Sequence, residues 1–201
     1  MSKEEEEQLF KKFGEIEGFS VKDHLGKGGY GSVIEIIMKK DNKVFAAKLL
    51  DKDKIEKEAQ KINGFKGPGI TKIIKVSQWN NRYLIIMEKS ALRDLDYFIY
   101  NLHKKNILYF IFYPFEIVGN NLLRFFIKKI LKGMEVLNRY NYSHFDIKPQ
   151  NILIFSKMIT KLVDFSVLSN IAVLKENQSS NKYNVPFGTH GYVPPEIYQY
   201  R

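Results

Sequence analysis

The chain has 201 residues, 44% of them hydrophobic and 14% aromatic, which is enough to bury a sizeable core as one domain or two small ones. A total of 32 Lys and Arg against 22 Asp and Glu gives a net charge of +10, but no basic run exceeds two residues, so a solvated lysine-rich surface is favoured over a nucleic-acid interface. The absence of cysteine excludes disulfides, thiolate metal sites and a Cys nucleophile, and favours a reducing, intracellular environment.

The N-terminal residues 1–18 predict a short amphipathic extension, in which Glu7 and Lys11 lie one helical turn apart. Its acidic start lacks the basic residues and apolar core of a signal peptide. The most apolar run, residues 107–115, is too short to span a bilayer and contains Pro114. We therefore expect a cytoplasmic protein without a membrane segment. Residues 107–115 are interpreted as core packing or, alternatively, as a docking patch.

Residues 19–88 predict a small antiparallel sheet that carries one helix. Two polar turns each separate two apolar runs, which is typical of β-hairpins. The four runs are residues 33–38, 43–50, 73–79 and 82–88. Between the hairpins, apolar side chains recur at helical spacing around Glu58, and this helix is expected to end before GFKGPG.

The pattern becomes helical beyond a short hinge near residues 88–91. Apolar side chains recur at helical spacing at Leu122, Phe126, Ile130, Leu131, Met134 and Leu137. Short strands are predicted at residues 152–155 and 161–163, on either side of the later polar motifs. The chain is therefore expected to be an α+β protein in two parts.

The stretch LGKGGYGSV places Gly26, Gly28, Gly31 and Val33 in the spacing GxGxxGxV between two predicted strands. Glycines let backbone N–H groups approach phosphate oxygens, because no Cβ stands in the way. Taken alone, the loop is equally compatible with an ordinary hairpin turn. The strand that follows it, in place of a helix, argues against a Rossmann or P-loop site.

A lysine and a glutamate form the second candidate feature. Alternation along the strand places Val44, Ala46 and Lys48 on one face. A cation that points into a site is useful for nucleotide phosphates, but a carboxylate must hold it. Glu58 is the candidate, since Glu56 points roughly the opposite way around the predicted helix. Either residue alone is more often a surface charge.

The stretch HFDIKPQN places Asp146, Lys148 and Asn151 in one polar run. Phosphoryl transfer needs a carboxylate that accepts or orients the hydroxyl proton, a cation for the transferred phosphate, and oxygen ligands for Mg²⁺. These three residues supply all three groups, and Asp164 in LVDFS adds a carboxylate oxygen for the metal. The order and spacing of the whole set favour a phosphoryl-transfer site.

From residue 19 to its end, the sequence resembles the eukaryotic protein kinase family. LGKGGYGSV is similar to the glycine-rich loop, AAK to the lysine strand, HFDIKPQN to the catalytic loop, DFS to the metal-binding motif and PPE to the end of the activation segment. The resemblance implies a two-lobed kinase-like fold after the extension 1–18. A small lobe of antiparallel sheet and one helix spans residues 19–88, and a mainly helical large lobe spans residues 89–201.

The resemblance also implies a function and its residues. ATP and Mg²⁺ are the implied cofactors, and the γ-phosphoryl group is transferred to Ser or Thr hydroxyls of protein substrates. Asp146, Lys148 and Asn151 are the implied catalytic residues, and Asn151 and Asp164 the metal ligands. The implied cofactor-binding residues are Leu25, Gly26, Gly28, Gly31, Val33, Ala46, Lys48, Glu58, Met87, Glu88, Ser90 and Leu153.

Within this resemblance, Glu58 pairs with Lys48, and residues 88–90 form the hinge that receives adenine. Lys148, with the later GTHGYVPPE, favours the serine/threonine branch over the tyrosine branch. Thr189 is then expected to support the substrate-facing side of the site.

Three features depart from the family pattern. Phe145 replaces the Arg before the catalytic Asp, as in non-RD kinases, so this position lacks a guanidinium for a phosphorylated activation segment. Ser166 replaces the Gly of the DFG motif and reduces backbone freedom. Because the sequence ends at Arg201, the large lobe is expected to be incomplete. The alternatives are a non-catalytic nucleotide-binding or scaffold fragment of a kinase and a basic nucleic-acid binder.

Overall fold

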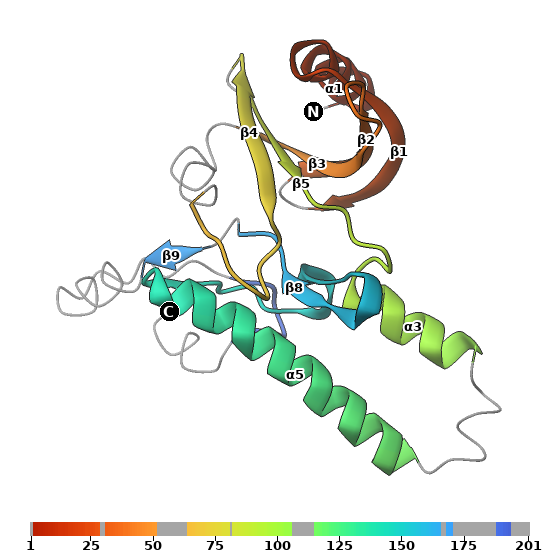
Figure 1. The fold of residues 1–201 in the computed structure, drawn as a ribbon, viewed down its shortest axis with the longest axis vertical. Helices are drawn as coiled ribbons and strands as arrows, with labels where there is room; N and C mark the ends of the chain where they lie inside the picture. Colours follow the sequence, from red (N-terminus) through yellow and green to blue (C-terminus); the bar gives the residue numbers. More distant parts are fainter. Residues whose placement is uncertain are drawn as a thin grey trace. The chain divides into compact units, whose positions relative to one another are not determined.

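The computed structural model describes residues 2–28, 31–51, 64–80, 82–105, 115–165, 168–170 and 188–193 (Figure 1). The chain forms two compact units. The first contains Met1–Gly64 and Lys72–Lys89, and the second contains Phe65–Thr71 and Ser90–Arg201.

The first unit contains a five-stranded sheet with the order β1-β2-β3-β5-β4, in which neighbouring strands are antiparallel. Its strands are β1 (Phe19–Gly28), β2 (Gly31–Met38), β3 (Val44–Asp51), β4 (Ile73–Trp79) and β5 (Arg82–Met87). Asn42 and Asn80 adopt positive φ angles of 55° and 42° in the turns after β2 and β4, a conformation that Asn tolerates well. The two predicted hairpins, and with them the antiparallel sheet, are confirmed. The predicted helix around Glu58 lies outside the described residues.

Helix α1 (Lys3–Glu17) occupies the N-terminal segment that the sequence predicts as helical. Ser2 and Glu5 form a capping box, in which each side chain accepts a hydrogen bond from the other residue's backbone N–H. Gly18 ends the helix in the left-handed conformation, with φ of 73°. The sequence therefore encodes both ends of this helix locally.

The core of the first unit lies between α1 and one face of the sheet (Figure 1). Its buried side chains are Phe10, Phe13, Phe19, Ile34, Ile36, Ala47, Leu49, Leu84 and Ile86. Side chains alternate between the two faces of a strand, so Ala47 and Leu49 point toward α1 while Ala46 and Lys48 belong to the opposite face. Helix α1 thus covers the sheet face that does not carry the candidate lysine.

The described α-helices of the second unit are α3 (Leu95–Lys105) and α5 (Phe115–Arg139). Four short strands form two antiparallel pairs, β6 with β9 and β7 with β8. These strands are β6 (Tyr142–Ser143), β7 (Ile152–Ile154), β8 (Thr160–Leu162) and β9 (Ser169–Asn170). Two 3-10 turns, Pro149–Asn151 and Ser156–Met158, flank β7.

Helix α5 has two apolar faces, whereas the sequence pattern indicates a single one. Phe126, Val136 and Leu137 are buried, but Leu131 and Met134 are 54% and 43% exposed. The spacing therefore predicts the helix correctly without distinguishing its core face. Among the described residues, no helix is long and apolar enough to cross a membrane.

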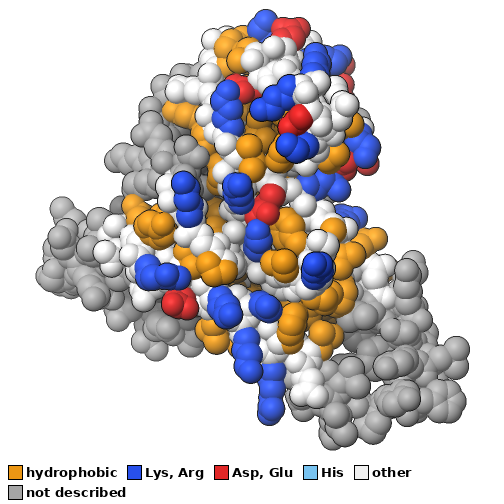
Figure 2. Space-filling model, viewed as in Figure 1, with side chains coloured by type: hydrophobic (Ala, Val, Ile, Leu, Met, Phe, Trp, Pro, Cys, Tyr) orange, Lys and Arg blue, Asp and Glu red, His pale blue; other side chains and the backbone are white. Residues whose placement is uncertain are grey.

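Figure 2 shows Lys and Arg side chains scattered over the face it presents, with acidic side chains among them. The basic residues do not gather into a single patch on that face. This distribution agrees with the solvated surface inferred from composition.

Two glycines allow α5 to approach a neighbouring loop closely. A Cβ at Gly133 would lie 2.4 Å from the carbonyl oxygen of Gly69, and a Cβ at Gly69 would lie 2.5 Å from the backbone nitrogen of Gly133. The same loop pairs with β8, because the N–H of Leu162 donates to the oxygen of Gly69 and the N–H of Thr71 donates to the oxygen of Leu162. Helix, loop and strand are therefore packed backbone to backbone.

We predict that Gly133→Ala destabilises the protein by about 1–3 kcal/mol, because overpacking outweighs the gain in helix propensity. Urea denaturation measures the free energy of unfolding. Lys128→Ala, at an exposed position of the same helix, is the control and should change this free energy by less than about 0.5 kcal/mol. Equal or greater stability of Gly133→Ala would contradict the close approach.

Candidate active site

The glycine-rich stretch forms the hairpin between β1 and β2, where Lys27 pairs with Ser32 and Gly28 with Gly31. Gly31 has a φ of 132°, and a Cβ there would lie 2.0 Å from the carbonyl oxygen of Leu49. This glycine is therefore required by the packing of the sheet itself. A Cβ at Gly26 would meet no atom within 4 Å, so space remains beside that position. The hairpin and phosphate interpretations of this stretch are thus compatible.

Lys48, Ala46 and Met87, predicted to bind the cofactor, lie on the central strands β3 and β5. Lys48 is 9% exposed and pairs with Val33 of β2 and Ile85 of β5. Ala46 pairs with Met87, the last residue of β5. The carboxylate of the next residue, Glu88, accepts a 2.5 Å hydrogen bond from the N–H of Lys72. Leu25, Gly26 and Gly28 lie on β1. The partner role of Glu58 lies outside the described residues and stays a prediction.

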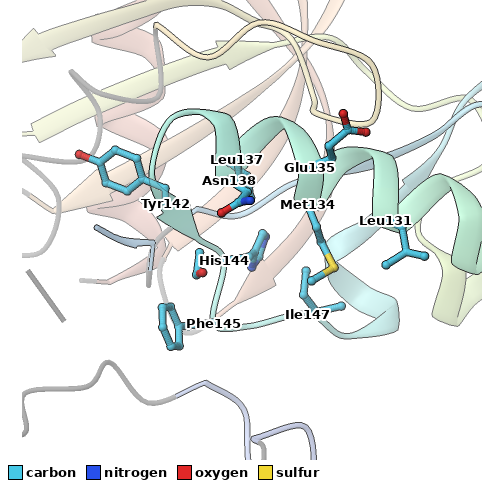
Figure 3. Close-up of a pocket in the computed structure, with 10 residues that line it drawn as sticks. Leu131, Met134, Glu135, Leu137, Asn138, Tyr142, His144, Phe145 and Ile147 are labelled. Carbon is cyan, nitrogen blue, oxygen red and sulfur yellow. The ribbon is translucent and has the colours of Figure 1, made fainter. Parts of the chain in front are cut away.

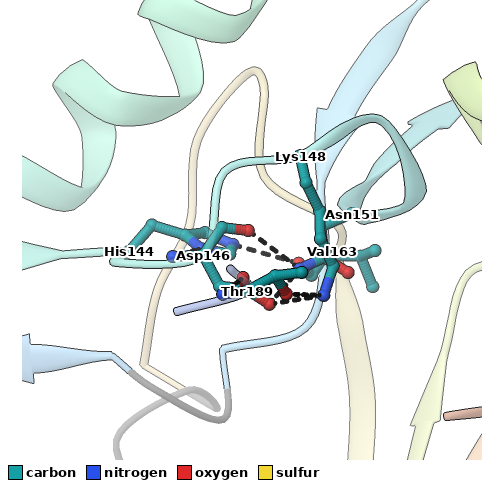
Figure 4. A network of polar contacts seen from close by, with 6 residues as sticks. All are labelled: His144, Asp146, Lys148, Asn151, Val163 and Thr189. Atoms are coloured by element: carbon teal, nitrogen blue, oxygen red, sulfur yellow. Dashed lines mark hydrogen bonds and ion pairs between the residues drawn. The ribbon is translucent and has the colours of Figure 1, made fainter. Parts of the chain in front are cut away.

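The second unit brings the three predicted catalytic residues together. Asp146 is 3% exposed, and Figure 4 shows it at the centre of a polar network. Its Oδ2 accepts a hydrogen bond from Asn151 Nδ2 at 2.9 Å and forms an ion pair with Lys148 Nζ at 2.8 Å. Its Oδ1 accepts a hydrogen bond from the backbone N–H of Thr189 at 2.8 Å. Lys148 Nζ also donates to the hydroxyl of Thr189.

These contacts determine the charge of Asp146. Burial would raise the pKa of its carboxyl group, but hydrogen bonds from Lys148 and Thr189 and the lysine charge outweigh burial and hold the pKa below its ordinary value. The carboxylate is therefore ionised at neutral pH. An ionised carboxylate can accept a hydrogen bond from a hydroxyl group and orient it, and it has a free valence for the proton of that hydroxyl.

His144 is a structural member of the site that the motif analysis did not assign. It is buried, its Nδ1 accepts a 3.3 Å hydrogen bond from the N–H of Asp146, and its Nε2 lies 3.0 Å from the carbonyl oxygen of Val163. Burial lowers the pKa of its imidazole, which is consistent with a neutral ring that donates through Nε2. His144 thus links the Asp146 backbone to the residue before Asp164. The sequence signal that could have identified His144 is its place in HFD, two residues before Asp146.

Two site residues have left-handed backbone conformations. Phe145 has a φ of 60° and Asp164 a φ of 63°, which are uncommon values for residues other than glycine. A Cβ at Gly188 would lie 2.2 Å from the carbonyl oxygen of Phe145. Gly188 itself can therefore lie against the backbone of Phe145. Residues held in such conformations concentrate at functional sites.

Asn151 and Asp164 fit a Mg²⁺ ion that takes most of its other ligands from substrate phosphates and waters. Both hydrogen bonds of the Asn151 side chain use Nδ2, so Oδ1 is the atom that can serve as a ligand. The N–H of Val163 donates to the backbone oxygen of Asn151, which ties the residue before Asp164 to Asn151. Across the described parts of the chain, no three His, Cys, Asp or Glu side chains gather in a metal-binding arrangement. Mg²⁺ commonly uses one or two carboxylates together with substrate phosphates and waters.

A cavity of about 470 Å³ lies on another side of the catalytic loop, lined by α5, β6 and the loop itself (Figure 3). Phe145, Ile147, Leu131 and Met134 contribute to its wall, and the side chains of Met134 and Ile147 point toward one another. Asp146 belongs to the polar network and does not line this cavity. The cavity is therefore distinct from the candidate catalytic groups.

Known proteins resemble the chain over most of its length. A sequence model of the protein kinase domain matches residues 19–201. The serine/threonine-protein kinase ULK3 of Mus musculus is 31% identical over 194 residues, and that of Homo sapiens is 32% identical over 195 residues. Each match covers 90% of this chain and 37% of the relative. The 3-phosphoinositide-dependent protein kinase B of Dictyostelium discoideum is 31% identical over 182 residues, with 86% of this chain and 18% of the relative covered.

The resemblance inferred from the spaced motifs is therefore confirmed. The chain spans little more than a third of the length of the ULK3 relatives. The five-stranded antiparallel sheet and the helices of the second unit agree with the same assignment. By its sequence match and its fold, the chain belongs to the protein kinase domain family.

Proposed function

We propose that the chain is a serine/threonine kinase that transfers the γ-phosphoryl group of ATP, bound with Mg²⁺, to a hydroxyl group of a protein substrate. The observation that carries the proposal is the buried, ionised Asp146 held by Lys148, Asn151 and Thr189. Phosphoryl transfer depends mainly on positioning and electrostatics, which such a network provides.

Each proposed site residue of the second unit then has a defined role. Asp146 orients the attacking hydroxyl and accepts its proton as the reaction proceeds. Lys148 presents a positive charge beside Asp146, and its side chain is 18% exposed, so it can reach a phosphate oxygen. Asn151 Oδ1 and the carboxylate of Asp164 would hold Mg²⁺, which neutralises phosphate charge when bound.

The cofactor-binding residues that the resemblance implies are proposed to bind the nucleotide. Lys48 and the backbone of the glycine-rich hairpin would contact phosphates, and residues 88–90 would contact adenine through their backbone. The proposed contacts are completed by Leu25, Val33, Ala46, Glu58, Met87 and Leu153.

A serine/threonine substrate is supported by the contact between Lys148 and Thr189. Both ULK3 relatives are named serine/threonine kinases. We also propose a cytoplasmic location, no nucleic-acid partner, and an organisation into an extension 1–18, a small lobe 19–88 and a large lobe 89–201.

We predict that Asp146→Asn lowers phosphoryl transfer by at least about 10²-fold, because the variant loses the proton acceptor. Mg-ATP binding should be largely retained. Radiolabel transfer to a generic basic protein measures the rate, and fluorescent-nucleotide titration measures binding. Asp96→Asn, at an exposed position of α3, is the control and should retain the wild-type rate. Undiminished transfer by Asp146→Asn would refute the assignment. Binding without transfer in the wild type would favour the non-catalytic alternative.

The hydroxyl of Thr189 generates a separate prediction. Thr189→Val removes the acceptor for Lys148 and should lower kcat about tenfold or more, because a hydrogen bond to a charged group contributes roughly 1.5–3 kcal/mol. Thr189→Ser keeps the hydroxyl and should retain most of the activity. Steady-state kinetics on a Ser/Thr peptide measures both variants. Equal rates for the two variants would show that this hydroxyl does not position Lys148.

The replacement of Arg by Phe145 generates a third prediction. Phosphatase treatment of the active protein should change its rate by less than about twofold, because this position offers no guanidinium to a phosphorylated activation segment. Mass spectrometry before and after treatment monitors the phosphorylated residues, and kinase assays on the same samples give the rates. A large fall in rate would indicate that another cation has this role.

A further inference from the structure

Glu6 differs from the other glutamates of the run that begins α1. It is 3% exposed, whereas Glu4, Glu5 and Glu7 are exposed. Carboxylates are rarely buried unless they are paired. Burial of this one glutamate therefore indicates specific partners beneath it.

The partners of Glu6 lie on the two arms of the glycine-rich hairpin. Its Oε2 lies 3.1 Å from Lys27 Nζ on β1. The hydroxyl of Ser32 on β2 is close enough to the carboxylate to lower the pKa of Glu6. Lys27 and Ser32 are directly opposite each other, and the next pair toward the tip is Gly28 with Gly31. One carboxylate thus joins both arms at the last pair before the glycines.

The balance of forces keeps this carboxylate charged. Burial would raise the pKa of Glu6, but hydrogen bonds from Ser32 and Lys27 and the charge of Lys27 outweigh burial and lower the pKa. Because the Lys27 side chain is 66% exposed, its ion pair alone contributes little. Ser32 is 2% exposed, so loss of its acceptor would leave a buried hydroxyl unsatisfied.

Helix α1 is itself firmly anchored to the sheet. Phe10 and Phe13 are buried in the core of the first unit. At the far end of the helix, Glu17 forms an ion pair with Lys75 at 2.6 Å and accepts a 2.6 Å hydrogen bond from the hydroxyl of Ser77, both on β4. The helix is therefore a fixed support for Glu6, and it contacts the sheet face opposite to that of Lys48.

We propose that Glu6 is a positioning residue for the nucleotide, which braces the two arms of the glycine-rich hairpin from the opposite sheet face and thereby increases the affinity for Mg-ATP. Glycines leave the backbone conformationally free, so ordering such a hairpin opposes binding. A carboxylate that holds both arms removes part of this freedom before the nucleotide arrives. Helix α1 precedes residues 19–201, which match the kinase domain, so the brace is an addition to that domain. The affinity part of this inference rests on the proposed function.

Variants at Glu6 and Glu7 test the brace. Glu6→Gln keeps an acceptor for Ser32 but loses the charge, while Glu6→Leu loses both. Glu7→Gln and Glu7→Leu are matched controls on the same turn. Amide hydrogen exchange without nucleotide measures the opening of residues 25–28 and 31–33. Fluorescent-nucleotide titration measures the Kd of Mg-ATP, and steady-state kinetics separates KM from kcat.

We expect faster exchange in the two arms for Glu6→Gln and faster still for Glu6→Leu, with the remaining strands unchanged. The Kd and KM for ATP should rise about three- to tenfold in the same order, while kcat stays within about twofold. The Glu7 variants should match the wild type. If Glu6→Leu does not fold, Glu6→Gln carries the test, because it keeps the size and polarity of the buried side chain and removes only its charge.

Two results would overturn the brace. One is wild-type exchange in the arms of the Glu6 variants. The other is faster exchange spread evenly over the sheet with no change in Kd, which would indicate a purely structural role. If the wild type does not bind Mg-ATP, the proposed function and the affinity part fail, and the exchange measured without nucleotide still decides whether Glu6 braces the hairpin.

Discussion

The ionised carboxylate of Asp146, buried among hydrogen-bond donors, is the interaction on which the candidate site depends. Both of its oxygens are engaged, one by Asn151 and Lys148 and the other by the backbone of Thr189. A buried charge without such partners would shift its pKa and become neutral. Each donor therefore keeps the group charged and also fixes its direction. The site is organised by the need to satisfy one anion.

The same requirement orders the chain around the catalytic loop. Thr189 is 43 residues beyond Asp146 in sequence, yet its N–H reaches that carboxylate. The approach is possible because Gly188 has no Cβ to meet the carbonyl oxygen of Phe145. On the other side, His144 connects the loop to Val163, directly before Asp164. Backbone contacts thus position the proposed proton acceptor, phosphate cation and metal ligands as much as their own side chains do.

A second buried carboxylate organises the first unit by the same physical principle. Glu6 is held by Lys27 and Ser32, while Phe10 and Phe13 supply the apolar burial that fixes its helix. Hydrophobic packing holds the helix against the sheet, and the carboxylate adds a specific polar contact between the helix and the hairpin. The helix that completes the core of the sheet is therefore also proposed to act on the glycine-rich hairpin.

The sequence by itself determined the local features and predicted the chemistry. Its alternating apolar runs predicted the hairpins, its helical spacing predicted α5, and Asp146, Lys148 and Asn151 were identified because a short motif keeps them together along the chain. These signals depend on near neighbours, so they can be read without the fold.

Only the tertiary structure decided which of several residues that look alike in the sequence are buried or closely packed. Four consecutive glutamates follow Lys3 at the start of α1, and the packing of the helix alone selects Glu6 for burial. The spacing of α5 did not show that Leu131 is exposed while Leu137 is buried, nor that Gly133 must meet Gly69 backbone to backbone. The physical reason is that burial and close approach depend on which surfaces from distant parts of the chain come together, whereas periodicity records only the neighbours within one element.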